Sequence, residues 1–503
     1  MALTLMAMAA CNSSQNESEE FIGRQTPEIT DRQFTPEVLW ALGRVGGYDV
    51  SPDGKTLIYN VSYYSVEKNK SHTVIKSTSI GESVAEENML TTSAQSENSP
   101  KFINEGKQIV FLSADEDGVS QLFMMNADGT GRKQISFSDK DIDDYLFSPD
   151  GQKVILIHQV ASKTPLYDDL PNANAHVETE VMYRHWDEWV ETIPHPFVAD
   201  FDGNKVGAEK DILEGEPFEC PMKPFGGIEQ LCWSPDSKQI AYTCRKKTGL
   251  DYAISTNSDI YLYDLENRTT VNLTEGMMGY ATKPQFSPDG KLLVWAMLDR
   301  LRDKWGVRLS CADDPNRNVP VTPIDEIAFE PRWSADGRYL VYSAFREGDP
   351  CWGCYIQEVA TGAEKRLCDG REPCLSPDGK TLVWTDNDRR HLHFRTMSAA
   401  DWPHGETVRE LDMPADAEPF FVTNLPPSAA AVTMPLDGRF DFGAEDVFYV
   451  KARVELGKDA WKGRTGFFGA RYGRIGESYG MSVTDGKFVG DSVCGYPKRP
   501  EGG

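Results

Sequence analysis

A four-residue turn motif that recurs along the chain constrains the fold more than any other feature of the sequence. Copies of Ser-Pro-Asp-Gly, or of a close variant, begin at Ser51, Ser148, Ser234, Ser287, Ser334 and Ser376, and a degenerate copy occupies 104–107. The copies are separated by about 42 to 53 residues, apart from one interval of 86. Proline fixes φ at the second position of a tight turn, and glycine accepts a positive φ. Each copy therefore predicts a sharp reversal between two strands.

Apolar runs of strand length follow the turns, and they predict buried central strands. The runs occupy 56–59, 108–111, 239–242, 292–295, 339–342 and 381–384. A second hairpin is clearest where 259–265 and 271–274 flank a polar turn. WD-like repeats of this length with four strands each are typical of propeller blades. We therefore predict an all-β protein whose residues 31–410 form a β-propeller of about seven blades.

The one long interval between turns predicts an insertion in a single blade. It separates Gly151 from Ser237, and its polar part runs from about 161 to 192. Inserted loops lie on the surface and often carry function. We therefore expect the insertion to lie on a propeller face and to contribute to a binding site.

An apolar run at the N-terminus stops at a cysteine. The run from Met1 to Ala10 is too short to span a bilayer, and Cys11 is followed by a polar, acidic stretch. This pattern resembles a bacterial lipoprotein signal. The resemblance implies lipidation of Cys11, a signal and acidic tether over 1–30, and an exported protein in the periplasm or anchored to the outer membrane. The alternative is an ordinary frayed N-terminus.

The charge balance excludes one class of partner. The chain has 78 Asp and Glu residues against 52 Lys and Arg residues, a formal net charge of -26. Such a surface repels phosphate backbones and anionic lipid headgroups. We expect no nucleic-acid partner, and contact with a membrane only through a lipid anchor.

Three stretches carry a resemblance to a known family. They are Met-Tyr-Arg-His-Trp-Asp-Glu-Trp at 182–189, His-Pro-Phe-Val-Ala-Asp at 195–200 and Asn-Ser-Asp-Ile-Tyr at 257–261. Together with the repeated turns they resemble the N-terminal propeller of prolyl-oligopeptidase-family serine peptidases, in particular exported dipeptidyl-peptidase-like members of Bacteroidetes. The resemblance covers about 30–300 and continues to about 400 through the turns alone. It implies a propeller that filters peptides into a hydrolase domain, and so a part in proteolysis.

The resemblance also implies a Ser, Asp, His triad with the serine on a Gly-x-Ser-x-Gly elbow. The one match is at 476–480, around Ser478. An elbow needs a buried strand before the serine and a helix after it, but 470–475 is polar and broken by glycine, and 481–489 predicts a hairpin. The last histidine, His404, precedes the serine, so no base follows it. We expect Ser478 not to be catalytic, and we expect no complete triad, metal or cofactor in this chain.

The C-terminal segment, 418–503, predicts a separate β-rich unit. Residues alternate between apolar and polar after Phe448, and the segment resembles the early strands of a laminin-G-like or concanavalin-like jelly roll. That resemblance implies sugar binding. We expect too few strands here to complete a β-sandwich.

Four of the ten cysteines crowd one predicted blade: Cys351, Cys354, Cys368 and Cys374. A turn at 361–362 places Cys354 and Cys368 opposite each other on adjacent strands, which predicts a cross-strand disulfide or free buried thiols. Zinc binding and redox catalysis are the alternatives.

The insertion carries the candidate substrate contacts. Arg184, Asp187 and Glu188 are flanked by Trp186 and Trp189. Carboxylates among aromatic rings can hold the α-amino group of a peptide by ion pairing and cation–π attraction. The family resemblance implies such a role for acidic residues on a propeller insertion. The alternative is that the tryptophans pack against the blade and the acids face solvent, and we expect His185 and His195 to be structural.

Three functions remain open from the sequence. The first is a module that docks and gates peptides for a serine peptidase hydrolase, without a recognisable catalytic half in this chain. The second is a non-catalytic surface lipoprotein that binds glycan or a protein partner. The third is a periplasmic assembly scaffold, since a propeller face offers a rigid docking surface.

Overall fold

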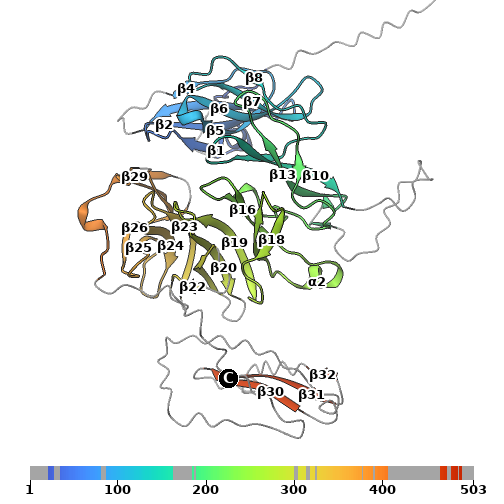
Figure 1. The fold of residues 1–503 in the computed structure, drawn as a ribbon. Coiled ribbons are helices and arrows are strands. Elements are labelled where there is room, and N and C mark those ends of the chain that lie inside the picture. Colours follow the sequence, from blue (N-terminus) through green and yellow to red (C-terminus); the bar gives the residue numbers. More distant parts are fainter. Residues whose placement is uncertain are drawn as a thin grey trace, which may run out of the picture. The chain divides into compact units, whose positions relative to one another are not determined.

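The computed structural model describes two compact units, Met1–Leu411 and Asp412–Gly503, and we treat each by itself. The described residues are 21–27, 34–80, 87–162, 184–185, 188–299, 304–312, 318–322, 326–376, 378–388, 391–405, 465–472, 477–484 and 487–489. No described helix is long and apolar enough to cross a membrane. Figure 1 shows the first unit as successive small sheets, coloured from blue to orange.

In the described residues of the first unit, seven antiparallel sheets correspond to the predicted blades, and one further two-stranded sheet lies in an insertion. Blades 1 to 3 contain β1 (Arg44–Val50), β2 (Thr56–Ser65), β3 (Lys70–Ser79) and β4 (Glu87–Met89); β5 (Glu97–Ile103), β6 (Gln108–Ala114), β7 (Ser120–Asn126) and β8 (Lys133–Gln134); and β9 (Asp144–Phe147), β10 (Lys153–Ala161), β13 (Thr192–Asp200) and β14 (Lys210–Asp211). The insertion of blade 3 contains a separate hairpin, β11 (Arg184–His185) and β12 (Glu188–Trp189).

Blades 4 to 7 continue the pattern. They contain β15 (Leu231–Trp233), β16 (Gln239–Cys244), β17 (Asp259–Asp264) and β18 (Thr269–Asn272); β19 (Gly279–Phe286), β20 (Leu292–Asp299), β21 (Lys304–Cys311) and β22 (Asn318–Pro320); β23 (Ile327–Trp333), β24 (Tyr339–Phe345), β25 (Gly353–Glu358) and β26 (Glu364–Asp369); and β27 (Arg371–Leu375), β28 (Thr381–Thr385) and β29 (Leu392–Thr396). The helices are short: α1 (Pro36–Ala41), α2 (Gly249–Ile254), η1 (Asn104–Gly106), η2 (Ile228–Gln230) and η3 (Ala399–Asp401). The predicted seven-bladed β-propeller is confirmed.

The N-terminal strand belongs to the first blade. β1 pairs with β2, and the seventh blade has three strands, β27 to β29, among the described residues. Blade 3 resumes after its insertion with β13, which begins at Thr192.

Each repeated turn is closed by its own serine and aspartate. The serine hydroxyl donates to the aspartate Oδ1 at 2.6–2.7 Å and accepts the backbone N–H five residues after it at 2.9 Å. The turn glycines, Gly106 of the degenerate copy included, have φ from +67° to +81°, and Ser237 takes the same left-handed conformation at +61°. A Cβ built on Gly106, Gly290 or Gly337 would lie 2.8 to 3.5 Å from the proline in the turn of the preceding blade. The repeated turns of adjacent blades therefore lie together at one end of the blades.

The central strands are continuous apolar runs because the blades are buried on both faces. In β6, Ile109 and Phe111 pack toward blade 1, whereas Val110 and Leu112 pack toward blade 3. Equivalent clusters fill each of the next blade boundaries, up to blades 6 and 7. Since both faces are covered, the central strands need no alternation of apolar and polar residues.

The first strand of most blades contains a bulge that the sequence analysis did not identify. Register shifts occur within β5, β19, β23 and β27, and the shifted residue precedes a proline in each. These residues are Ser99, Lys283, Glu330 and Glu372, with φ between +52° and +58°. β1 has the same shift at Gly46 and Gly47. A bulge bends a strand and redirects a side chain.

The second unit contains a three-stranded antiparallel sheet, β30 (Thr465–Tyr472), β31 (Glu477–Thr484) and β32 (Lys487–Val489). The expected hairpin over 481–489 is present as β31 and β32. The alternating stretch after Phe448 lies outside the described residues, as do Cys11 and the rest of 1–20.

Candidate functional site

The insertion and the longest described loop of blade 4 lie at one end of their blades. In an antiparallel blade, successive connections alternate between the two ends, and the repeated turns join the first and second strands. The connection between the second and third strands must therefore lie at the opposite end. In blade 3 this connection contains the β11–β12 hairpin and joins the end of β10 to the start of β13, which pair with each other (Figure 1 labels both strands). In blade 4 it contains α2. We call this end the loop face.

The β11–β12 hairpin presents three of the five predicted contact residues. Arg184 pairs with Trp189 across the hairpin, and the Arg184 guanidinium lies 5.0 Å from the centroid of the Trp189 ring. Trp189 is 42% exposed, and Glu188 is exposed beside it. Trp186 and Asp187 lie outside the described residues. The hairpin thus offers an exposed carboxylate next to an exposed aromatic ring that already carries one cation.

His185 fastens this hairpin to the propeller. Its Nε2 lies 3.0 Å from Oε2 of Glu219, which belongs to the connection between blades 3 and 4 and is 4% exposed. The Tyr252 hydroxyl of α2 donates to the other oxygen of Glu219, and the Arg245 guanidinium lies 4.0 Å from that oxygen. Arg245 also stacks on Tyr252, 4.1 Å from the ring centroid. One buried carboxylate therefore joins the insertion, the blade connection and α2.

The chemistry of Glu219 suits anchoring. Burial, together with the Glu219 carboxylate, holds the pKa of the Tyr252 hydroxyl well above its usual value, so this hydroxyl remains a donor. Both carboxylate oxygens have partners within the protein. A buried charge needs such partners to offset its lost hydration. The cluster positions the hairpin, whereas the exposed Glu188 carboxylate is free of the anchor.

The structural role expected for His185 and His195 stays a prediction, and each imidazole lies beside one carboxylate. His195 Nδ1 lies 2.8 Å from Oδ2 of Asp211 on the paired strand β14. The sequence did not predict the residues that anchor the hairpin, Glu219, Arg245 and Tyr252, because they lie on separate segments that share no motif. The one available signal was the short helix-forming stretch 249–254 inside an otherwise β-rich repeat.

A second group of charges lies on the first strands of the early blades. The Asp49 carboxylate of β1 accepts the Phe102 N–H at 2.8 Å, and Lys101 Nζ of β5 donates to the Tyr48 carbonyl at 3.1 Å. Burial raises the pKa of Asp144 on β9 to about 6, although the Tyr145 N–H and Lys101 oppose this shift. Burial likewise raises the pKa of Asp49. The Asp49 and Lys101 contacts join blades 1 and 2, whereas burial gives Asp144 a pKa of about 6.

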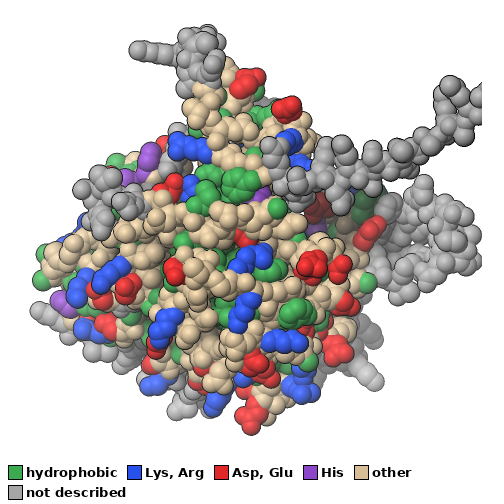
Figure 2. All heavy atoms as spheres, turned by 90° about the horizontal axis from the view of Figure 1, so that it is seen from above, with side chains coloured by type: hydrophobic (Ala, Val, Ile, Leu, Met, Phe, Trp, Pro, Cys, Tyr) green, Lys and Arg blue, Asp and Glu red, His purple; other side chains and the backbone are tan. Residues whose placement is uncertain are grey.

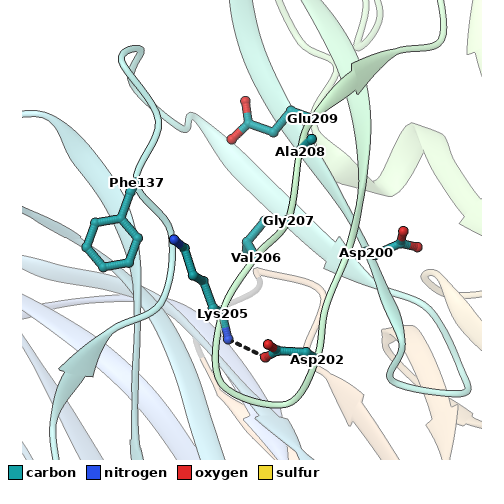
Figure 3. Close-up of a pocket in the computed structure, with 8 residues that line it drawn as sticks. All are labelled: Phe137, Asp200, Asp202, Lys205, Val206, Gly207, Ala208 and Glu209. Carbon is teal, nitrogen blue, oxygen red and sulfur yellow. Dashed lines mark hydrogen bonds between the residues drawn. The ribbon is translucent and has the colours of Figure 1, made fainter.

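A surface pocket of about 440 Å³ lies between blades 2 and 3. Figure 3 shows its lining, which comprises Phe137, Asp200, Asp202, Lys205, Val206, Gly207, Ala208 and Glu209. Lys205 Nζ lies 5.1 Å from the Phe137 ring centroid, and Glu209 Oε2 lies 3.2 Å from Nε2 of the buried His158. Backbone N–H groups of Asn204 and Lys205 lower the pKa of Asp202. Glu209, Lys205 and Asp202 thus each have a contact within the protein: an imidazole, an aromatic ring and backbone N–H groups.

The excess of acidic residues is not gathered in one patch on the face shown in Figure 2, where acidic and basic side chains are interspersed. Among the described residues, no group of three or more His, Cys, Asp and Glu side chains could hold a metal ion.

The serine of the Gly-x-Ser-x-Gly match lies inside a strand. Ser478 is the second residue of β31 and pairs with Arg471 of β30. In the described part of this unit, the strand continues to Thr484 and leads into β32. This backbone differs from a strand-to-helix elbow, in which the chain turns at the nucleophile.

Comparisons with known proteins give related sequences. The chain is 41% identical over 349 residues to dipeptidyl-peptidase 5 of Porphyromonas gingivalis, a match that covers 68% of this chain and 50% of that protein. It is 44% identical over 273 residues to dipeptidyl-peptidase 5 of Porphyromonas endodontalis, covering 53% of this chain and 39% of that protein. The matched part thus spans about half the length of these curated relatives, or less. No protein-family profile matches the chain.

Among solved structures, the β-propeller domain of the Trilobed protease from Pyrococcus furiosus aligns with a TM-score of 0.43 at 13% identity. That alignment covers 74% of this chain and 98% of the solved chain.

Proposed function

We propose that this chain, which carries the β-propeller of a peptidase-family protein, docks peptides on its loop face and admits them to a serine peptidase active site. The observation that carries the proposal is the 41% identity over 349 residues to dipeptidyl-peptidase 5 of P. gingivalis. That protein's name describes release of dipeptides, which requires recognition of a peptide's N-terminal end. The hydrolytic step itself is assigned to a catalytic portion that the described residues do not show.

The anchored hairpin supports the loop face as the place of docking. Glu188 is exposed on β12, next to the exposed Trp189 ring, and the His185–Glu219 contact holds this hairpin against the propeller. A peptide α-amino group can pair with the carboxylate while its first side chains contact the ring. Asp187, which adjoins Glu188 in the sequence, would contribute a second carboxylate. Arg184 already stacks on Trp189 and would orient that ring.

Peptide titration tests the docking proposal. We expect a tetrapeptide with a free α-amino group to quench tryptophan fluorescence and to bind about tenfold more tightly than its N-acetylated form, because one ion pair is lost on acetylation. Glu188→Gln should weaken only the free peptide. Glu266→Gln, on the exposed connection between β17 and β18, is the matched control and should leave both affinities unchanged.

The same titration separates the alternatives. Equal affinity for the two peptides in the wild-type protein would contradict recognition of the N-terminus. Binding of soluble glycans in place of peptides would favour the glycan-binding function. Hydrolysis of dipeptidyl chromogenic substrates by this chain, blocked by a serine-directed fluorophosphonate, would contradict the assignment of catalysis to another portion.

The proposal extends to export as a lipoprotein through Cys11, which the apolar run before this residue supports. In a bacterial host, radiolabelled fatty acid should be incorporated into the wild-type chain and not into Cys11→Ser. Equal labelling of both would overturn the lipidation site.

A further inference from the structure

Two cysteines on the outer strands of blade 6 face each other directly. Cys354 of β25 and Cys368 of β26 are Cα partners in the register, as the turn at 361–362 predicted. Directly opposed residues of an antiparallel pair have Cα atoms about 4.5 to 5.5 Å apart, which lies within the range that a disulfide bridges. The Cys368 side chain is also the main cause of the raised pKa of the Cys354 thiol, and no disulfide links the two residues in this structure.

The two thiols differ in access to solvent. Cys354 is fully buried, at 0% exposure, whereas Cys368 is partly exposed near the end of β26. A register shift directly follows the pair, between Cys354 and Tyr355, so the strand is locally irregular beside Cys368. Bulges of this kind redirect side chains and occur beside functional sites. In the folded protein a soluble reagent can therefore reach Cys368 more readily than Cys354.

Two arginines lie near the more exposed thiol, and both also form ion pairs with carboxylates. Arg366 crosses the strand pair beside Gly353 and forms an ion pair with Asp369 at 2.7 Å. Arg395 of β29 is the second cation near Cys368. The Cys354 thiol is the main cause of the lowered pKa of Cys368; burial opposes it, and Arg395 and Arg366 lower it further against Asp369. Cys368 and burial raise the pKa of Cys354. A thiolate is the reactive form of cysteine, so these opposite shifts favour reaction at the more exposed sulfur.

We infer that Cys354 and Cys368 form a redox-active pair in which Cys368 attacks a small-molecule disulfide and Cys354 resolves the mixed disulfide. In the first step the Cys368 thiolate attacks one sulfur of the reagent, whose S–S bond breaks as one thiol leaves. In the second step Cys354 loses its proton, attacks the Cys368 sulfur and expels the second thiol. Two protein thiols thereby lose two electrons and two protons, and the reagent becomes two thiols.

The resulting disulfide would link the two outermost strands of blade 6. The linkage would join β25 to β26 next to the hydrophobic cluster shared by blades 6 and 7, against which Cys368 packs. Oxidation would therefore stabilise the blade boundary adjoining the three-stranded seventh blade. This site is independent of the proposed peptide docking, which lies on blades 3 and 4.

To test the inference, the full chain is treated with oxidised glutathione, its remaining thiols are alkylated, and its peptides are mapped without reduction. We expect linked peptides that contain Cys354 and Cys368, a glutathione adduct on Cys368 at early times, and a higher melting temperature. Cys354→Ala should retain a lasting adduct on Cys368. In Cys368→Ala, we expect Cys354 to react with oxidised glutathione at least about tenfold more slowly than Cys368 does in the wild-type chain, since the Cys354 thiol is buried.

Cys351→Ala is the matched control, because Cys351 is the other cysteine of the Cys-x-x-Cys sequence and should not be needed. The inference would be overturned by a Cys351–Cys354 linkage, by an early adduct on Cys354, or by failure of the wild-type chain to form any linkage. The wild-type time course decides the order of reaction even where a variant fails to fold.

Discussion

At the scale of single residues, the turn serines combine two roles in one hydroxyl group. Ser287 donates to Asp289 and accepts the Leu292 N–H, so its hydroxyl satisfies a backbone group and orients a side chain. The serine is also the main cause of the lowered pKa of Asp289. These bonds explain why Ser and Asp recur in this motif beside the Pro and Gly that the turn geometry favours.

Removing one such hydroxyl should destabilise the propeller. We expect Ser287→Ala to lower the free energy of unfolding by about 1 to 2 kcal/mol, because a buried N–H and a carboxylate each lose a partner. Urea unfolding followed by circular dichroism measures the change. Thr269→Ala, an exposed substitution on β18, is the control and should change stability by only a few tenths of a kcal/mol. If Ser287→Ala leaves the free energy of unfolding unchanged, the turn backbone alone holds the reversal.

The pKa of Asp144 is raised in the folded protein, whereas that of a turn aspartate such as Asp289 is lowered. The two kinds of residue therefore give the free energy of unfolding pH dependences of opposite sign. Its folded pKa, about 6, is above the ordinary value of 3.8, so the folded state binds more protons between these values and stability falls as pH rises through this window. Asp144→Asn should therefore stabilise the protein by about 1 to 3 kcal/mol above pH 6 and leave it unchanged near pH 4.

Urea unfolding at pH 4.5 and pH 8 checks this expectation. The neighbouring exposed Asp143→Asn is the control and should show a much smaller difference between the two pH values. If Asp144→Asn has the same effect at both pH values, the carboxyl does not titrate in this window.

At the scale of strands and loops, local sequence determined what could be predicted. The tight turn at 361–362 fixed the register of its hairpin, so the opposition of Cys354 and Cys368 followed from counting residues. The bulges before proline were not anticipated, although proline in a strand signals an edge position or a bulge. The contact between His185 and Glu219 depends on loops 34 residues apart, and no local pattern encodes their approach.

The anchor of the hairpin can be tested by proteolysis. We expect His185→Ala to accelerate tryptic cleavage after Arg184 several-fold, because the hairpin loses its contact with Glu219 and opens more often. The melting temperature should change little, since β11 and β12 form a sheet separate from the blades. His391→Ala, which removes an exposed histidine of blade 7, is the control. Unchanged cleavage would show that other contacts hold the hairpin.

At the scale of the whole molecule, cohesion comes from hydrophobic clusters shared between neighbouring blades. Each of the boundaries from blades 1 and 2 to blades 6 and 7 has such a cluster, and the described members of all clusters lie between Ile22 and Trp402. Burial of apolar surface is the main favourable term in folding. The first unit therefore contains its own core.

This arrangement predicts that the first unit folds by itself. A chain ending at Leu411 should keep its melting temperature within a few degrees, because the clusters between blades remain intact. It should also keep its affinity for a peptide with a free α-amino group, since β11, β12 and α2 all belong to this unit. Differential scanning calorimetry and the fluorescence titration measure the two properties.

A shorter chain ending at Val359 is the control, because it would lack blade 7 and the last strand of blade 6. The cluster between blades 6 and 7 would then lose Leu375 and Leu382, and the melting temperature should fall sharply. Loss of stability in the longer chain would instead mean that the propeller depends on residues after Leu411.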